Sequence, residues 1–222
     1  MGGDGPGATA GLVDVTTTAL LLSGGIDSAA VAAWKHPDIA LFIDYGQRSA
    51  FAERRAARAV AAELGIRHHE LTVGLDALGA GVLKDDVTRD GWPSPEWWPY
   101  RNQLLVTCAA AWLTTNAEIL EIEMPPQARI LMGTVSSDAS RHRDGSFRFF
   151  EALNALLASQ EGFIGVDVPA IEMSTQQLIL VSHITDSVMG WTHSCHTANL
   201  PCGVCPGCNK REQVLRDVNR LN

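Results

Sequence analysis

Short apolar runs alternate with helix-forming segments along most of the chain. The pattern predicts strands at Thr16–Leu22, Ile39–Ile43, His69–Val73, Ile130–Val135 and Val166–Ile171. It predicts helices at Ser28–Trp34, Phe51–Leu64, Gln103–Thr115, Phe147–Ala158, Ser174–Met189 and Arg211–Leu221. Strands that alternate with helices favour a parallel sheet, because each parallel connection needs a crossover. We therefore expect an α/β fold, an open parallel sheet covered by helices on both faces.

Three segments interrupt this pattern and suggest the domain boundaries. Residues 1–15 are rich in Gly and Ala, and we interpret them as a disordered tail before a main domain at 16–190. After Gly190 the composition changes to Cys, Gly, Pro and Asn, so 191–222 is predicted to form a compact tail with a closing helix. Leu75–Pro99 has no clear period and is long for a connection, which favours a lid or binding loop. Its Trp92, Trp97 and Trp98 could cover a planar ligand or only fix the loop to the body.

Composition and charge narrow the class of protein. The chain has 222 residues, 46% of them hydrophobic, and a formal net charge of −8. No apolar run has the length of a membrane span, and Met1–Asp14 lacks the order of a signal peptide. The acidic balance argues against an extended nucleic-acid surface, although a local basic pocket remains compatible with it.

The segment Leu20–Ser28 carries the clearest chemical pattern. An apolar run ends in Ser23-Gly24-Gly25-Ile26-Asp27-Ser28, and a helix-forming run follows at once. Two glycines let a ligand approach the backbone, and loop N–H groups together with the start of a helix attract an anion. An aspartate would repel a bare phosphate, so Asp27 suggests a bound Mg²⁺. The lysine of a Walker loop is absent. The alternative is a strand–turn–helix corner whose glycines serve packing alone.

Polar clusters follow two other predicted strands. Asp44-Tyr45-Gly46-Gln47-Arg48 comes directly after one, and Ser136–Ser146 comes after the strand that holds Gly133 near its end. In open parallel sheets the ligand crevice lies at the carboxyl ends of the strands. We therefore expect both clusters to face the glycine loop.

Four of the five cysteines crowd the end of the chain, and their spacing predicts a metal site. Cys195-x₆-Cys202-x₂-Cys205-x₂-Cys208 supplies four thiolates within one short segment. Four sulfurs suit tetrahedral Zn²⁺ and leave no open position, so the role should be structural. The alternatives are ligation by His193 or His196, two disulfides, free thiols or an iron–sulfur cluster. Without a secretion signal, clustered cysteines favour metal and a reducing cytoplasm. Cys108, inside an apolar run, is predicted to be a buried, inert thiol.

The segment from Ser23 to Ser28 resembles the pyrophosphate loop of the ATP-pyrophosphatase (PP-loop) families. Those enzymes split ATP between its α- and β-phosphates and form an adenylated intermediate. Three further stretches narrow the resemblance to 7-cyano-7-deazaguanine synthases: Asp44–Arg48, Pro99-Tyr100-Arg101-Asn102, and Thr192–Cys195 with Cys202–Cys208 and Arg211. The resemblance covers nearly the whole chain after the first 15 residues and implies a PP-loop domain with a zinc-bound tail.

The resemblance also implies a reaction and a set of site residues. ATP would adenylate 7-carboxy-7-deazaguanine, ammonia would give an amide, and a second ATP would drive formation of the nitrile, with Mg²⁺ and Zn²⁺ present. The catalytic candidates are Ser23, Asp27, Arg48 and Arg101. The nucleotide-binding candidates are Leu22, Ser23, Gly24, Gly25, Ile26, Asp27, Ser28, Asp44 and Gly133. The substrate-binding candidates are Tyr45, Gln47, Arg101, Asn102, Asp138 and Asp144. The alternatives are surface salt bridges for Arg48 and Arg101, and capping or turn roles for Asn102 and Asp138.

The sequence departs from the family pattern in two places. Where the family usually reads Asp-x-Ser-Gly-Tyr-Pro-Asp-Cys-Arg, this chain has Asp138-Ala139-Ser140-Arg141-His142-Arg143-Asp144-Gly145-Ser146. Where the family has Thr-Lys-x-Glu-Ile, this chain has Ser174-Thr175-Gln176-Gln177-Leu178 and therefore no lysine. These departures indicate a divergent paralogue.

Several functions stay open at this point. A paralogue that adenylates the same or a similar acid could pass it to another amine, such as a protein acceptor in a defence or secondary-metabolite system. A tRNA thiolase would need redox-active cysteines and a basic surface, which this chain does not favour. A non-catalytic nucleotide-binding module is the remaining alternative. The resemblance also favours a homodimer, with Phe51–Leu64 and the closing helix as candidate faces.

Overall fold

A computed structural model of the chain describes residues 16–85, 88–122 and 127–220. The predicted tail at 1–15 lies outside the described residues. Within them, five parallel strands form one sheet in the order β3-β2-β1-β4-β5. The strands are β1 (Thr17–Leu21), β2 (Ile39–Asp44), β3 (Arg67–Thr72), β4 (Gln127–Leu131) and β5 (Phe163–Asp167). The chain builds β2 and β3 on one side of β1 and then crosses to β4 on the other, so the strand order reverses beside β1.

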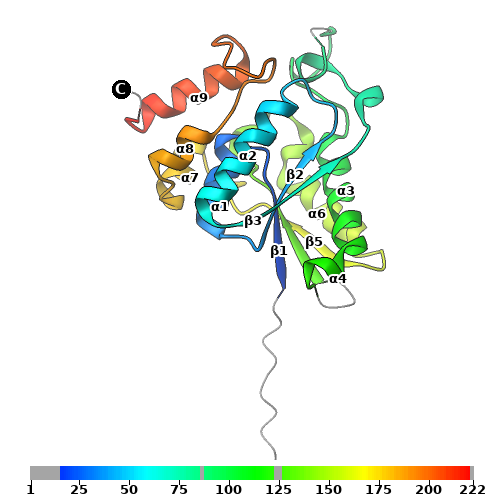
Figure 1. The fold of residues 1–222 in the computed structure, drawn as a ribbon. Helices are drawn as coiled ribbons and strands as arrows, with labels where there is room; N and C mark the ends of the chain where they lie inside the picture. The colour runs from blue at the N-terminus through cyan, green and yellow to red at the C-terminus, as the bar shows by residue number, and fades with distance from the viewer. Residues whose placement is uncertain (1–15, 86–87, 123–126, 221–222) are drawn as a thin grey trace, which may run out of the picture.

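Helices cover both faces of the sheet, as predicted (Figure 1). One face carries α3 (Arg101–Thr115), α4 (Ala117–Leu120) and α6 (Phe147–Leu157). The other carries α1 (Ile26–Lys35), α2 (Ala50–Leu64), α7 (Thr175–Ser182), α8 (Asp186–Trp191) and α9 (Pro206–Asp217). Side chains of β2 alternate between the two cores, with Leu41 packed on the first and Phe42 on the second. None of the described helices has both the length and the hydropathy for crossing a membrane.

The fourth and fifth strands start and end earlier than predicted, so those two ranges were wrong. Both predictions followed apolar residues that continue past the strand ends. Val135 and Ala170 are fully buried, yet they lie in irregular backbone after β4 and β5. Val135 and Ala170 are apolar because they pack in the core, and not because they pair in the sheet.

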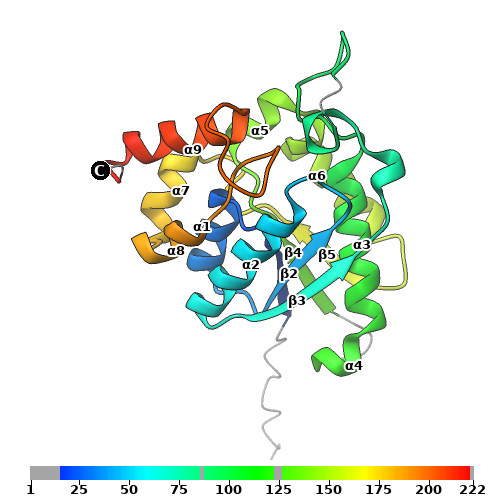
Figure 2. The same ribbon diagram turned by 45° about the horizontal axis from the view of Figure 1, so that its top comes forward.

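The predicted helix Ser174–Met189 is two helices. His183 adopts the left-handed conformation, with φ of 51°, and ends α7. Thr185 then caps α8 by accepting a hydrogen bond from the N–H of Val188 at 3.2 Å. The second helix therefore runs in a new direction toward the cysteine-rich tail (Figure 2).

The closing helix and the polar cluster Ser136–Ser146 also differ from prediction. The closing helix begins at Pro206, inside the cysteine motif and not at Arg211, because Cys205 caps it and proline fits the first turn. The cluster Ser136–Ser146 contains a short helix, α5 (Ser136–Arg141), and a 3₁₀ turn at Arg143–Gly145. In the described part of Leu75–Pro99, regular structure is limited to 3₁₀ turns at Asp76–Leu78 and Gly81–Leu83.

Candidate active site

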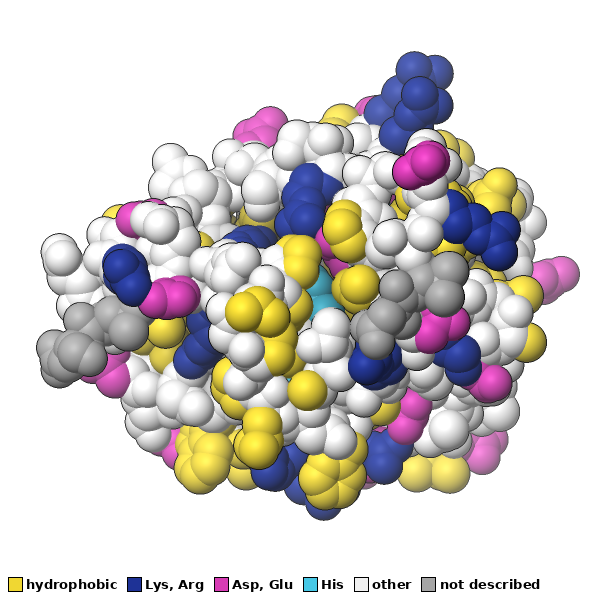
Figure 3. Space-filling view, turned by 90° about the horizontal axis from the view of Figure 1, so that it is seen from above, with side chains coloured by type: hydrophobic (Ala, Val, Ile, Leu, Met, Phe, Trp, Pro, Cys, Tyr) yellow, Lys and Arg dark blue, Asp and Glu magenta, His cyan; other side chains and the backbone are white. Residues whose placement is uncertain are grey.

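A cavity of about 320 Å³ opens at the carboxyl ends of β1, β2 and β4, where the strand order reverses. Its lining comes from the glycine loop, the start of α3, the segment after β4, and the cysteine-rich tail. Figure 3 looks down on this edge of the sheet, where a histidine side chain is visible in a hollow among hydrophobic side chains. Of the predicted site residues, twelve line the cavity: Leu22, Ser23, Gly25, Ile26, Asp27, Ser28, Tyr45, Gln47, Arg101, Asn102, Gly133 and Asp138.

The glycine loop is held in shape by its own serines. The hydroxyls of Ser23 and Ser28 are 3.1 Å apart, and Ser28 donates to the carbonyl of Gly25 at 3.0 Å. The N–H of Gly25 donates to the Ser23 hydroxyl at 3.3 Å. Gly24 has a φ of +78° and packs so closely on α2 that a Cβ would lie 2.7 Å from that of Ala56. Gly24 therefore positions the loop against α2 and does not itself line the cavity.

Gly133, the predicted glycine outside the glycine loop, forms part of the cavity floor. A Cβ at this position would lie 2.7 Å from the backbone nitrogen of Ser28, at the first turn of α1. Only glycine lets the segment after β4 approach the glycine loop this closely. The two sides of the cavity meet at this contact.

Gly133→Ala should therefore displace the glycine loop. We expect ATP binding to weaken at least about tenfold and the melting temperature to fall, because backbone must move to remove the clash. Calorimetric titration with ATP and thermal denaturation measure the two effects. Gly190→Ala is the matched control, because a Cβ added there would meet no atom within 4 Å and the residue sits inside α8. If the Gly133→Ala protein binds ATP as tightly as the Gly190→Ala protein does, the assignment of Gly133 to the nucleotide-binding site is wrong.

Two carboxylates face each other across the floor of the cavity. Asp27 accepts a hydrogen bond from the Thr175 hydroxyl at 2.7 Å and forms an ion pair with Lys210 at 2.8 Å. Asp138 accepts from the N–H of Val135 at 2.9 Å. Burial raises the pKa of Asp138, and the charge of Asp27 adds to this, while Lys210 opposes it. The floor thus holds two acids and the ammonium of α9.

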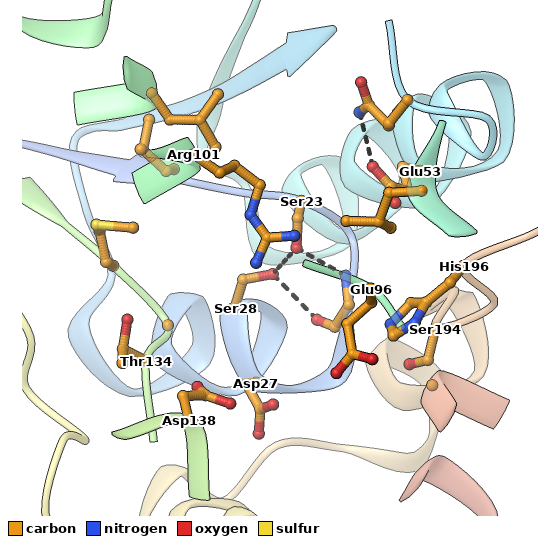
Figure 4. A pocket seen from close by; sticks show the side chains of 18 of the residues that line it. Ser23, Asp27, Ser28, Glu53, Glu96, Arg101, Thr134, Asp138, Ser194 and His196 are labelled. Carbon is orange, nitrogen blue, oxygen red and sulfur yellow. Dashed lines mark hydrogen bonds between the residues drawn. The ribbon is translucent and has the colours of Figure 1, made fainter. Parts of the chain in front are cut away.

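Arg101 and Tyr45 form the opposite wall. Figure 4 shows the Arg101 guanidinium pointing toward Ser23 and Ser28. Burial lowers the pKa of Arg101, but its interactions with Tyr45, Asp144 and Glu53 raise it overall, so the guanidinium stays charged. Burial also raises the pKa of Tyr45 to about 12. Gln47 donates to Glu53 at 2.8 Å and accepts from the N–H of Tyr45 at 2.9 Å, which fixes this wall.

A third cluster lies on the Trp-rich segment. Glu96 is 5% exposed and forms an ion pair with Arg141, and its Oε1 is 3.8 Å from Nε2 of His142. Burial alone would raise the pKa of Glu96, but its interactions with His142, Arg141 and His196 lower it to about 2. The Ser94 hydroxyl lies 3.2 Å from the same His142 nitrogen.

Three predicted site residues besides Gly24 lie outside the cavity lining. Asp44 pairs with Arg54 at 2.6 Å and accepts from the N–H of Gly46 at 3.1 Å. Arg48 is exposed. Asp144 binds Asn102, whose side-chain amide donates to the Asp144 carbonyl at 2.8 Å. Asp144 therefore positions Asn102, and contact of these three residues with ligands stays a prediction.

The four cysteines of the tail form one cluster. Their sulfurs all lie within 4.8 Å of one another, with Cys195–Cys205 and Cys202–Cys208 at 3.9 Å each. A disulfide bond is about 2.05 Å long, so both pairs are unbonded. Tetrahedral zinc with bonds of about 2.3 Å places its sulfurs roughly 3.8 Å apart. The N–H groups of His196 and Cys208 both point at Cys205 Sγ, at 3.4 Å. The spacing of the four sulfurs fits a zinc ion, which the four cysteine thiolates would hold.

The tail is attached directly to the glycine loop. The N–H of His193 donates to the carbonyl of Gly24 at 2.8 Å. Arg211 donates to the carbonyl of Met189 at 3.0 Å and to the Thr192 hydroxyl. The folding of the cysteine cluster is therefore coupled to the shape of the glycine loop.

Sequence reasoning missed three charged residues of the cavity: Glu53, Glu96 and Lys210. Lys210 lies two residues after the last cysteine of the motif, a spacing that could have placed it near the loop. Glu96 lies in a segment without periodicity, and no local pattern marks it.

Comparison with known proteins adds an independent observation. The family model described as "Queuosine biosynthesis protein QueC" matches residues 17–219. A 7-cyano-7-deazaguanine synthase of Parasynechococcus marenigrum is 31% identical, covering 92% of this chain and 94% of its own. Those of Methylococcus capsulatus and Methanothermobacter thermautotrophicus are 33% and 30% identical, covering 87% and 88% of this chain and 91% and 92% of their own.

Proposed function

The chain belongs to the QueC family of queuosine biosynthesis proteins, and on that premise we propose that it is an ATP-dependent synthase. It converts 7-carboxy-7-deazaguanine and ammonia to 7-cyano-7-deazaguanine through an amide, with release of AMP and pyrophosphate. The observation that carries this proposal is the cavity in which the glycine loop, Arg101 and Lys210 converge beside two carboxylates.

The chemistry requires that a carboxylate oxygen become a good leaving group. Attack of that oxygen on the α-phosphorus of ATP forms an acyl adenylate and releases pyrophosphate; ammonia then displaces AMP to give the amide. A second ATP activates the amide oxygen, and loss of AMP leaves the nitrile. The protein contributes positioning and charge neutralisation. The loop N–H groups with Ser23 and Ser28 bind the pyrophosphate, and Arg101 binds phosphate or the acid.

Lys210 supplies the cation that this chain lacks at the start of α7. In the alignment with Thr-Lys-x-Glu-Ile, that lysine falls at Thr175. Thr175 hydrogen-bonds Asp27, and Lys210 reaches the same carboxylate from α9. The neighbouring Gln176 donates to Asp217 of α9 at 2.7 Å and so helps to orient the helix that carries Lys210. Mg²⁺ would offset pyrophosphate charge while keeping mostly water ligands, and Asp27 and Asp138 are the acids available to it.

The tail acts structurally in this account. Zinc bound by Cys195, Cys202, Cys205 and Cys208 holds residues 191–222 against the main domain at 16–190. We propose the cytoplasm as the compartment, because clustered cysteines that serve as metal ligands are typical of a reducing environment. A homodimer stays part of the proposal, with α2 and α9 as candidate faces.

A second function has support from one observation. The departing residues Arg141 and His142 line the cavity, and both contact Glu96. A changed cavity wall is what a paralogue would need to pass the same acid, or a similar one, to another amine, such as a protein terminus.

One incubation separates the two functions. The protein is incubated with Mg·ATP, ammonium and 7-carboxy-7-deazaguanine, and pyrophosphate and product mass are followed. The nitrile mass is the result that the synthase predicts. The amide mass alone would favour the paralogue, and absence of any acid-dependent pyrophosphate would overturn the synthase and any paralogue that uses this acid.

A further inference from the structure

The proposed phosphate chemistry leaves one cluster of the cavity unused. Glu96 lines the cavity from the Trp-rich segment, and its Oε2 is buried without a hydrogen-bond partner in the described part of the chain. Nδ1 of His196, across from it in the tail, is also buried and unpartnered there. Figure 4 shows the Glu96 carboxylate pointing into the cavity beside His196. A buried acceptor without a donor is costly unless a ligand supplies one.

The neighbours of Glu96 fix both its charge and its orientation. Arg141 and His142 approach Oε1 from one side, and Ser94 contacts His142 in turn. With Oε1 occupied in this way, Oε2 is the oxygen left for a ligand. The carboxylate is ionised throughout the physiological pH range, since its pKa is about 2. It can therefore only accept hydrogen bonds, so its ligand must present N–H or O–H donors.

Resting on the proposed function, we infer that Glu96 recognises the donor edge of the acid's 2-aminopyrimidinone ring. That edge carries a ring N–H and an exocyclic amino group side by side, so it presents hydrogen-bond donors to Oε2. The remaining end of the ring system, with its carboxylate, is then free to face the glycine loop and Arg101. Glu96 is thus a specificity-determining residue and takes no part in the phosphate chemistry.

The residues that orient Glu96 are those at which the chain departs from its family. Arg141 and His142 stand where the family pattern has Gly and Tyr, so the ion pair between Glu96 and Arg141 belongs to this divergent wall. Arg141 is 38% exposed in its side chain while Glu96 is 7% exposed. The arginine therefore closes the outer side of the carboxylate and leaves its inner side to the cavity.

The test compares selectivity rather than rate alone. Wild-type and Glu96→Gln proteins are assayed for acid-dependent pyrophosphate release with 7-carboxy-7-deazaguanine and with its analogue that lacks the 2-amino group. We expect the wild type to prefer the 2-amino acid by about 10- to 100-fold in kcat/KM, as for a lost hydrogen bond to a charged group. Glu96→Gln should reduce this preference to within about threefold, mainly through KM for the acid. Glu151→Gln, an exposed position on α6, is the matched control.

A binding measurement keeps the inference separate from the proposed function. Calorimetric titration with 7-deazaguanine, which has no carboxylate to activate, should show binding that weakens at least about tenfold in Glu96→Gln. If no acid is turned over but this binding depends on Glu96, the function fails and the subsite stands. If the acid is turned over and selectivity is equal in the two proteins, the function stands and the inference is overturned. A higher KM for ammonia with unchanged selectivity would also overturn it, because the amine would then be the occupant.

Discussion

Lys210→Met should lower kcat for acid-dependent pyrophosphate release by about 10²- to 10³-fold. Removal of one positioned group that stabilises developing charge in a cavity has effects of this size. The ammonium lies 2.8 Å from Asp27, at the loop that we assign to pyrophosphate. Because the charge on the leaving pyrophosphate grows in the transition state, kcat should change more than KM for ATP. Steady-state kinetics with a pyrophosphate-coupled assay measures both.

Two further variants separate the position of the charge from its presence. Lys210→Arg keeps a cation at the site and should recover most of the activity. Lys35→Met removes an equal charge at the far end of α1, where the lysine stacks on Trp34 at 3.6 Å, and should behave as wild type. The assignment of Lys210 is wrong if Lys210→Met and Lys35→Met have the same kcat.

Loss of one zinc ligand should have the second large effect. In Cys205→Ser, we expect bound zinc to fall well below one ion per chain and the melting temperature to drop by about 8–16 °C. Lost metal sites belong to the mutations that cost about 4 kcal/mol or more, and about 2–4 °C accompanies each kcal/mol in a chain of this size. Activity should fall as well, since His193 holds the glycine loop from the tail. Metal analysis and thermal denaturation provide the measurements.

Cys108→Ser is the matched control for this experiment. Cys108 lies in α3, outside the cluster, and is half-buried. The zinc content of the Cys108→Ser protein should equal that of the wild type. Full zinc content in Cys205→Ser, or an equal loss in Cys108→Ser, would refute a four-cysteine site.

The fold and the glycine loop could be predicted because their signals are local. The apolar strand before Ser23 and the helix after Ser28 are adjacent in sequence, and the alternation of elements determined the parallel sheet. Strand ends were less certain, because residues such as Val135 and Ala170 are apolar for packing and not for pairing. The break at His183 depends on one left-handed residue, which helical periodicity does not reveal.

The missed site residues have a different physical origin. Lys210 reaches Asp27 across 183 positions of sequence, and only tertiary packing of α9 brings them together. Glu96 comes to the cavity from a segment whose path is set by contacts such as the N–H of Val82 with the carbonyl of Pro95, at 2.9 Å. The cysteines were identified because metal ligation imposes a spacing on the sequence. No such spacing links a lysine or a glutamate to its distant partner.

The measurement that tests the central claim most directly is an isotope transfer. The acid is prepared with ¹⁸O in its carboxylate and incubated with the protein, Mg·ATP and ammonium, and the AMP is analysed by mass. Adenylation of the carboxylate predicts that each AMP formed with the first product carries one ¹⁸O, because the oxygen leaves with the phosphorus. AMP without label, or no AMP that depends on the acid, would contradict the account.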